Sequence, residues 1–69
     1  MHDYYAGDLI QILEVEQGYI FDPSSGMNVI PKQEVYGSIG IISEINGNEY
    51  EILINNQLIY VVSPELTRL

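Results

Sequence analysis

Residues 36–62 carry the clearest pattern of apolar and polar positions in this 69-residue chain. Three runs rich in Ile, Leu, Val and Tyr are separated by two short polar segments, Asn-Gly-Asn at 46–48 and Asn-Asn-Gln at 55–57. Asn tolerates a positive φ and Gly adopts one without steric cost, so Asn-Gly between β-like runs favours a tight hairpin turn. Residues 55–57 give a weaker form of the same signal. The pattern therefore predicts a three-stranded antiparallel meander.

The second and third strands of this meander differ in how their apolar residues are distributed. Residues 49–54 alternate, with Tyr50, Ile52 and Ile54 on one face, which is typical of a strand buried on one side. Residues 58–62 are apolar throughout, so the pattern gives this strand no solvent face. Either both of its sides are covered by the protein itself, or one side meets another molecule.

A further strand is predicted near the N-terminus, after the pair Gly7-Asp8. Alternation gives this strand two possible inward-facing sets, and a bulge or bend in mid-strand would let both serve, as in small curled barrels. The two sets are Ile10 with Ile12, and Leu9 with Leu13 and Val15.

The remaining segments predict turns and short β-like pieces. Residues 16–18 are predicted to be a turn, and residues 19–31 a long irregular hairpin with its tip near Ser24. Ser63 suits a helix N-cap and Pro64 the first helical position, so we predict a single 3₁₀ turn over 63–67. The last two residues could then return as a final β pairing.

The order of these elements resembles that of the Src-homology-3-like small β-barrels. The resemblance rests on Gly7-Asp8, on Gly37-Ser-Ile-Gly-Ile-Ile and on Ser63-Pro-Glu-Leu. It is greatest to short barrel proteins of tailed bacteriophages and bacteria, with a distant similarity to KOW-type modules. It implies an all-β fold of about five antiparallel strands with the 3₁₀ turn near the C-terminus. The length predicts a single domain over residues 1–69, in which residues 1–6, before the first strand, are expected to be a loosely ordered lead-in. The chain has no Trp, so the proline-rich-peptide binding of the family's signalling branch is not expected.

Length and composition are consistent with one small water-soluble domain. Such a domain buries only about 60% of the surface that its unfolded chain exposes, so it is marginally stable alone. It has no cysteine to add a disulfide or a thiolate-bound metal. No apolar run approaches the ~20 residues of a membrane span and no signal-peptide pattern occurs, so we expect a cytoplasmic protein, in the host cytoplasm or the virion if it is phage-encoded.

The charge balance excludes some partners. Ten acidic residues face only two basic ones, Lys32 and Arg68, for a formal charge of −8. Direct binding to nucleic acid or to anionic membranes needs more cations than this. The acidic excess serves solubility, or it forms a surface that meets a basic partner or mimics a nucleic-acid backbone. The candidate acidic surface is Glu44, Glu49 and Glu51.

Enzymatic chemistry is not expected. Glu49 and Glu51 share one strand face, but a carboxylate pair needs a pocket that raises one pKa, and an exposed stripe next to a turn is more typical of a solvated surface. His2, the one histidine, is second in the chain, and residues 22–26 are typical of a turn rather than a calcium loop. We predict no catalytic, cofactor-binding or metal-binding residues and no cofactor.

The predicted function is a non-enzymatic protein-interaction or assembly module, of bacteriophage origin by resemblance, that binds a protein partner or itself as a homo-oligomer. The chain carries more strand-patterned apolar surface than the interior of one small barrel needs. The alternative is an acidic decoy that occupies the nucleic-acid site of a host protein. The candidate interface residues are Leu53, Leu58, Ile59, Tyr60 and Val61.

Overall fold

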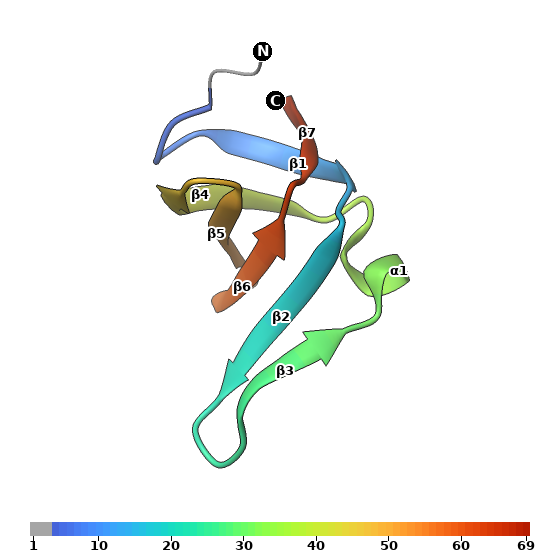
Figure 1. Ribbon diagram of the computed structural model, residues 1–69. Helices are drawn as coiled ribbons and strands as arrows, with labels where there is room; N and C mark the ends of the chain where they lie inside the picture. Colours follow the sequence, from blue (N-terminus) through green and yellow to red (C-terminus); the bar gives the residue numbers. More distant parts are fainter. Residues whose placement is uncertain (1–3) are drawn as a thin grey trace.

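Seven antiparallel strands and one short helix make up residues 4–69, which are the residues described by the computed structural model (Figure 1). The elements are β1 (Leu9–Glu14), β2 (Gln17–Asp22), β3 (Gly26–Ile30), α1 (Lys32–Val35), β4 (Ile39–Asn46), β5 (Glu49–Ile54), β6 (Gln57–Val62) and β7 (Glu65–Arg68). The sheet has the strand order β3-β2-β6-β5-β4-β1-β7. The all-β prediction is confirmed, but the sheet has seven strands where about five were expected. The difference arises because the expected irregular excursion is a regular β2–β3 hairpin and because the C-terminal segment is a strand.

The predicted meander is present as β4, β5 and β6, and its second turn has the expected conformation. Asn55 and Asn56 both have positive φ angles, 50° and 64°, as the mirror-image hairpin turn requires. In the first turn Asn46 still pairs with Glu49, so the connection begins at Gly47, whose φ is 62°. The turn is thus one residue later than the Asn-Gly pair suggests.

A β-bulge in β1 determines which of the two possible sets of side chains faces the core. Ile10 and Ile12 are fully buried, and the register against β7 shifts just after Ile12. The extra residue restores the inward direction for Val15, which is also buried, while Leu9 and Leu13 point outward and are exposed. A bulge is thus present in this strand, but it brings only Val15 of the second set into the core.

The C-terminal segment is a strand, and the predicted 3₁₀ turn over 63–67 is wrong. Ser63 turns the chain with a φ of 46°, and β7 then pairs with β1. Leu66 explains the difference: paired with Ile12 in an extended strand, its side chain reaches the core and is buried. Arg68 pairs with Ile10, so the expected final β pairing is present.

Two local features were also missed. Helix α1 has only four residues, too few to produce a helical period in the sequence, yet it buries Val35. In place of the turn predicted at 16–18, Val15 and Glu16 alone connect the two strands, the Glu16 N–H donates to the carbonyl of Val62, and β2 begins at Gln17. The chain therefore passes from β1 into β2 with almost no loop.

The core is made of aliphatic side chains from one face of the strands together with Val35 of α1. Gly40 lets β4 approach β5 closely, since a Cβ at this position would lie 2.6 Å from the carbonyl oxygen of Leu53. The buried residues are Ile10, Ile12, Val15, Val35, Ile42, Ile52, Ile54, Ile59, Val61 and Leu66.

Part of the expected loose lead-in is tied to this core. Tyr4 packs against it, and its hydroxyl donates to the carbonyl of Leu66 at 2.6 Å. The N–H of Gly7 donates to the carbonyl of Ile42 at 2.7 Å. The rest of the predicted lead-in, residues 1–3, lies outside the described residues.

Candidate protein interface

Strand β6 is buried on one face only, which removes part of the predicted interface. Ile59 and Val61 point into the core, with 9% and 0% of their surface exposed, so they are not part of the outer face of β6. The alternation of a strand places Leu58 and Tyr60 on the other face, where Leu58 is exposed and Tyr60 half-buried. The apolar pattern of β6 therefore combines a core face with a partly exposed apolar face.

The exposed face of β6 continues into a row of aliphatic residues that crosses three further strands. Leu58 lies opposite Leu53 of β5, Leu53 opposite Ile41 of β4, and Ile41 opposite Leu9 of β1. All four side chains are exposed, by 37–45%. We call Leu9, Ile41, Leu53 and Leu58 the outer apolar row.

The outer apolar row is extended at its β1 end. The N–H of Leu69 donates to the carbonyl of Leu9 at 3.0 Å, which places an exposed Leu69 beside the row. Ile39, two residues before Ile41 in β4, is also exposed. It lies opposite Gln11 of β1, and Gln11 lies opposite Thr67 of β7 on its other side. The residues flanking the row on this side are thus uncharged. Exposed aliphatic residues in register across neighbouring strands are a feature of protein-interaction sites.

Only part of this surface was predicted from the sequence. Leu53 and Leu58 were predicted. Leu53 is apolar on the otherwise acidic face of β5, and Leu58 lies in β6, which has no polar face in the sequence. Leu9 and Ile41 were not predicted to be surface residues. For Leu9 the sequence allowed an outward side chain, since Ile10 and Ile12 were the alternative inward-facing set of that strand.

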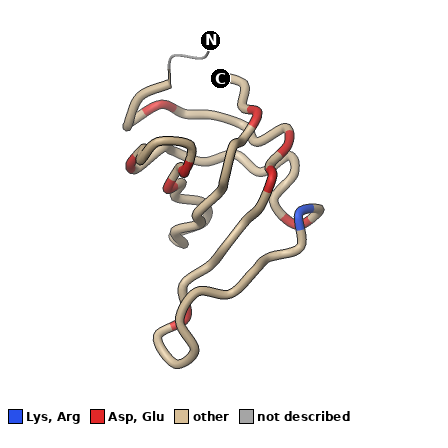
Figure 2. The backbone as a smooth tube through the Cα atoms, viewed as in Figure 1, with Lys and Arg blue, Asp and Glu red and all other residues tan. Residues whose placement is uncertain are grey.

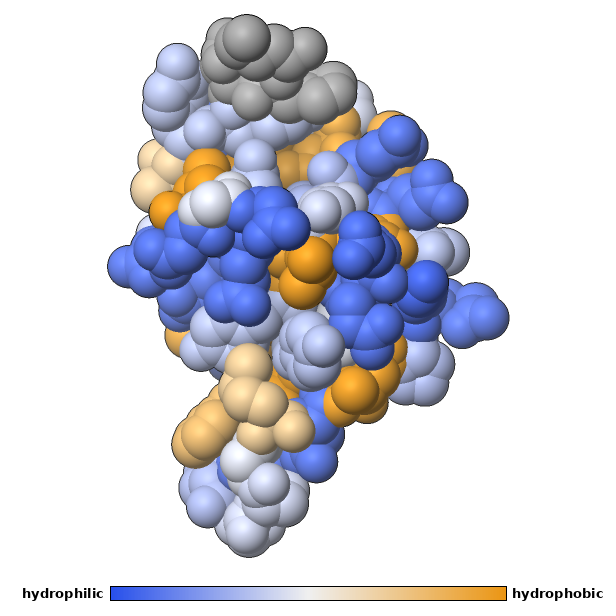
Figure 3. All heavy atoms as spheres, viewed as in Figure 1, coloured by the Kyte–Doolittle hydropathy of each residue, from blue (hydrophilic) through white to orange (hydrophobic). Residues whose placement is uncertain are grey.

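A second exposed apolar surface lies on the β2–β3 hairpin. Phe21 lies opposite Met27 and Tyr19 opposite Val29, and three of these residues are at least half exposed. Tyr19 also pairs with Tyr60 of β6, whereas the tip of the hairpin beyond Ile20 extends away from the rest of the sheet (Figure 1 and Figure 3).

The three predicted acidic residues lie together at the β4–β5 turn. Glu44 is paired directly across the strands with Glu51, and Glu49 with Asn46 (Figure 2). The amide of Asn46 donates to Oε2 of Glu44 at 2.8 Å. Like charges directly opposite one another destabilise a sheet. The three residues of the acidic surface are therefore neighbours in the structure, and the opposed carboxylates lower the stability of the fold.

The positive charges of the chain lie elsewhere. Arg68 forms a salt bridge of 2.9 Å with Asp8, and Lys32 lies in α1. A second pair of opposed carboxylates, Glu14 and Glu65, occurs where β1 meets β7. Both basic side chains therefore come from elements other than the β4–β5 hairpin that carries the acidic surface.

Sites for other chemistry are limited in the described part of the chain. Among residues 4–69 no group of three or more His, Asp or Glu side chains is placed to hold a metal ion. His2 lies outside this range. The helix found in the same residues is too short to cross a membrane.

Comparison of the chain with protein-family models, with curated proteins and with solved structures gave no match. The function must therefore be argued from the surfaces described above.

Proposed function

We propose that this protein is a non-enzymatic assembly module that associates with a second copy of itself through the outer apolar row. The observation that carries the proposal is the unbroken register of four exposed aliphatic residues over four neighbouring strands. Burying these side chains removes apolar surface from water at roughly 25 cal/mol per Å².

We propose a second copy of the chain as the molecule that covers the outer apolar row. The row is neutral on its Ile39 side, so two copies can meet there without placing carboxylates against each other. A two-fold axis through such a patch makes it self-complementary, which is the commonest arrangement in homo-oligomers. A small domain that is marginally stable alone also gains stability by associating.

The net charge gives this association a distinctive salt dependence. Each copy carries a formal charge of −8, so two copies repel one another at low ionic strength. Added salt screens this repulsion. Self-association should therefore become stronger as salt is added, the opposite of binding to a basic partner.

The test is the mass in solution, measured by light scattering over a series of protein and NaCl concentrations. We expect a mass above that of the monomer, rising with both concentrations. Ile41→Glu places a charge in the outer apolar row and should give a monomer. Gln33→Glu adds the same charge on exposed α1 and should leave the mass unchanged. A wild-type protein that stays monomeric at every protein and salt concentration would overturn the proposal.

The fold of the module is proposed to be a Src-homology-3-like barrel. In support, strands β7, β1, β4, β5 and β6 are consecutive in the sheet, and the hairpin β2–β3 is inserted between β1 and β4 in the sequence. The bulge in β1 and the near-absence of a loop before β2 let the sheet curl back, so that β2 pairs with β6. With this fold we also propose the bacteriophage origin that the sequence resemblance implies, and a place in the host cytoplasm or the virion.

A second candidate function is the acidic decoy, favoured by the opposed pair Glu44 and Glu51. A sheet that accepts repulsion between these residues is consistent with selection for a dense negative surface. Capture from bacterial extract tests it: nucleic-acid-binding proteins should be retained at low salt and released at high salt. The triple variant Glu44→Gln, Glu49→Gln, Glu51→Gln should not retain them. Equal capture by the wild type and the triple variant would exclude this function for the acidic surface.

A further inference from the structure

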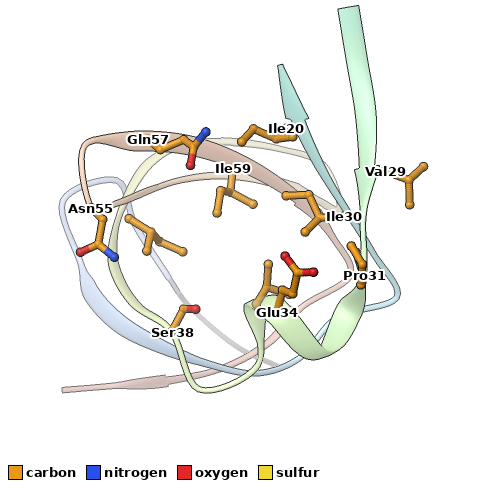
Figure 4. A pocket seen from close by; sticks show the side chains of 11 residues that line it. Ile20, Val29, Ile30, Pro31, Glu34, Ser38, Asn55, Gln57 and Ile59 are labelled. Atoms are coloured by element: carbon orange, nitrogen blue, oxygen red, sulfur yellow. The ribbon is translucent and has the colours of Figure 1, made fainter. Parts of the chain in front are cut away.

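A pocket of about 430 Å³ lies at the end of the sheet where α1 and the β5–β6 turn meet (Figure 4). The ribbon curves around it, and the β2–β3 hairpin forms one side. This volume lies in the lower part of the range of ligand sites in proteins, so it suits a small ligand or a single side chain. The pocket is separate from the outer apolar row, which belongs to the other face of the strands.

The inner wall of the pocket is part of the hydrophobic core. Ile54 and Ile59 line it, and at 8% and 9% they are the most exposed of the core residues. Val35 of α1 and half-buried Ile20 and Ile30 of the hairpin complete the wall. The core is therefore open at this end, and a hydrocarbon group that entered would be covered by aliphatic side chains on several sides.

The mouth of the pocket is polar and carries a negative charge. Glu34 is the charged residue among those lining it, and its carboxylate points across the opening in Figure 4. Ser38, Asn55 and Gln57 supply a hydroxyl and two amides around the same opening. Within the described residues, these four side chains make no hydrogen bond to another protein group, so all are available to a ligand.

The combination of wall and mouth defines the ligand chemistry. The wall favours a short alkyl chain, and Glu34 with the neighbouring oxygens favours a cationic, hydrogen-bond-donating end. The formal charge of −8 attracts cations to the whole surface and disfavours anions. A carboxylate-ended ligand with the same hydrocarbon body would place its charge against Glu34.

We infer that this pocket binds an alkyl chain ending in an ammonium or guanidinium group. Two sources share this chemistry: a small free amine, and a lysine or arginine side chain presented by a partner protein. The inference does not depend on the proposed self-association, because no residue of the outer apolar row lines the pocket.

The first experiment is a titration of the ¹⁵N-labelled protein with n-butylammonium, followed by ¹H–¹⁵N NMR. We expect saturable shifts of the resonances of Ile20, Ile30, Ile54 and Ile59. Butyrate, which has an alkyl chain of similar size and the opposite charge, should give smaller shifts at equal concentration. Equal or larger shifts with butyrate, or shifts confined to residues outside the pocket, would overturn the inference.

The second arm tests the role of Glu34. Glu34→Gln should raise the dissociation constant for n-butylammonium about two- to five-fold, the range expected for one partly exposed ion pair. Glu44→Gln removes an exposed carboxylate near the β4–β5 turn that does not line the pocket, and it is the matched control. An unchanged dissociation constant in Glu34→Gln, or an equal change in Glu44→Gln, would show that the general negative charge attracts the amine.

The third arm separates the two sources. N-acetyl-lysine methylamide and its arginine counterpart present the same cations from a peptide backbone. If either binds more tightly than n-butylammonium, the pocket receives a side chain from a partner protein. If both bind more weakly, the backbone is excluded and the ligand is a free amine. Either result leaves the assembly test by light scattering unaffected, so the two proposals can fail independently.

Discussion

Asp8 and Arg68 form an ion pair that joins the segment before β1 to the end of β7. Nη2 of Arg68 donates to Oδ2 of Asp8 at 2.9 Å, and Nε donates to the same oxygen at 3.3 Å. The guanidinium also lies over the ring of Tyr4, with Cζ 5.1 Å from the ring centroid. Residues from the two ends of the described chain are thus held together at one end of the sheet.

The ion pair gives the protein a defined response to acid. The hydrogen bond from Arg68 holds the pKa of Asp8 below its ordinary value, and the N–H of Tyr5 lowers that pKa further. Because the folded-state pKa is the lower one, ionised Asp8 stabilises the fold above the unfolded pKa of 3.8. This stabilisation is lost as the pH falls through the folded-state pKa.

We predict that Arg68→Gln raises the pKa of Asp8 toward its ordinary value, while the Tyr5 N–H retains part of the lowering. A carboxyl ¹³C NMR titration measures this change. Asp22 is an internal control, since its pKa is lowered by the hydroxyl and N–H of Ser24 and should not move. An unchanged Asp8 titration in the variant would show that the salt bridge does not persist in solution.

Tyr4→Phe tests whether the N-terminal segment is tied to the sheet. The variant loses the 2.6 Å hydrogen bond to the carbonyl of Leu66 and should lower the free energy of unfolding by about 0.5–1.5 kcal/mol. Tyr5→Phe removes a hydroxyl from a side chain that is 65% exposed and should have little effect. Urea denaturation compares them, and equal stabilities of the two variants would show that the Tyr4–Leu66 hydrogen bond does not stabilise the fold.

Gly40→Ala should destabilise the sheet strongly. The new Cβ would lie 2.6 Å from the carbonyl oxygen of Leu53 and 2.8 Å or less from side-chain carbons of Ile52 and Ile54, so β4 and β5 must move apart. We expect a loss of at least about 1–3 kcal/mol, as for other overpacked interiors. Thermal unfolding provides the measurement.

Gly18→Ala is the matched control for this substitution. Gly18 also lies in a strand, but the nearest atom to its Cβ would be a methyl carbon of Val35 at 3.9 Å, an ordinary contact. The variant should therefore unfold close to the wild-type temperature. A Gly18→Ala protein as unstable as Gly40→Ala would mean that strand glycines are needed here for a reason other than close approach.

Ile41 and Ile42 are neighbours in β4 with opposite environments, 45% and 1% exposed. Ile42→Ala leaves a cavity in the core and should cost about 2–5 kcal/mol of stability. Ile41→Ala should change monomer stability by no more than about 0.5 kcal/mol, as for most surface changes. Dilute samples separate stability from association. The proposed self-association predicts that Ile41→Ala lowers the mass measured at high protein concentration.

The elements with strong local signals were predicted well from the sequence. The meander follows from Asn and Gly residues at turn positions that need positive φ, and the core face of β5 follows from alternation. The strand β7 was missed because Ser63 and Pro64 are typical of a helix start. Only contact with β1, far away in the sequence, makes the extended form of Leu66 favourable.

The candidate interface was predicted in part for the same reason. Leu53 and Leu58 stand out within their own strands. That they align with Leu9 and Ile41 depends on the register between strands, which a single sequence does not encode locally. The pocket was not predicted, since its residues come from the hairpin, α1 and the β5–β6 turn.

The strand order implies a sequence of events in folding. Strands β4, β5 and β6 are linked by two-residue turns, so their pairing closes only short loops and can form early. The pairing of β1 with β7 closes a loop that spans most of the chain, so we expect it to form late. We therefore expect substitutions in the meander to slow refolding, and the loss of the Tyr4–Leu66 contact mainly to speed unfolding.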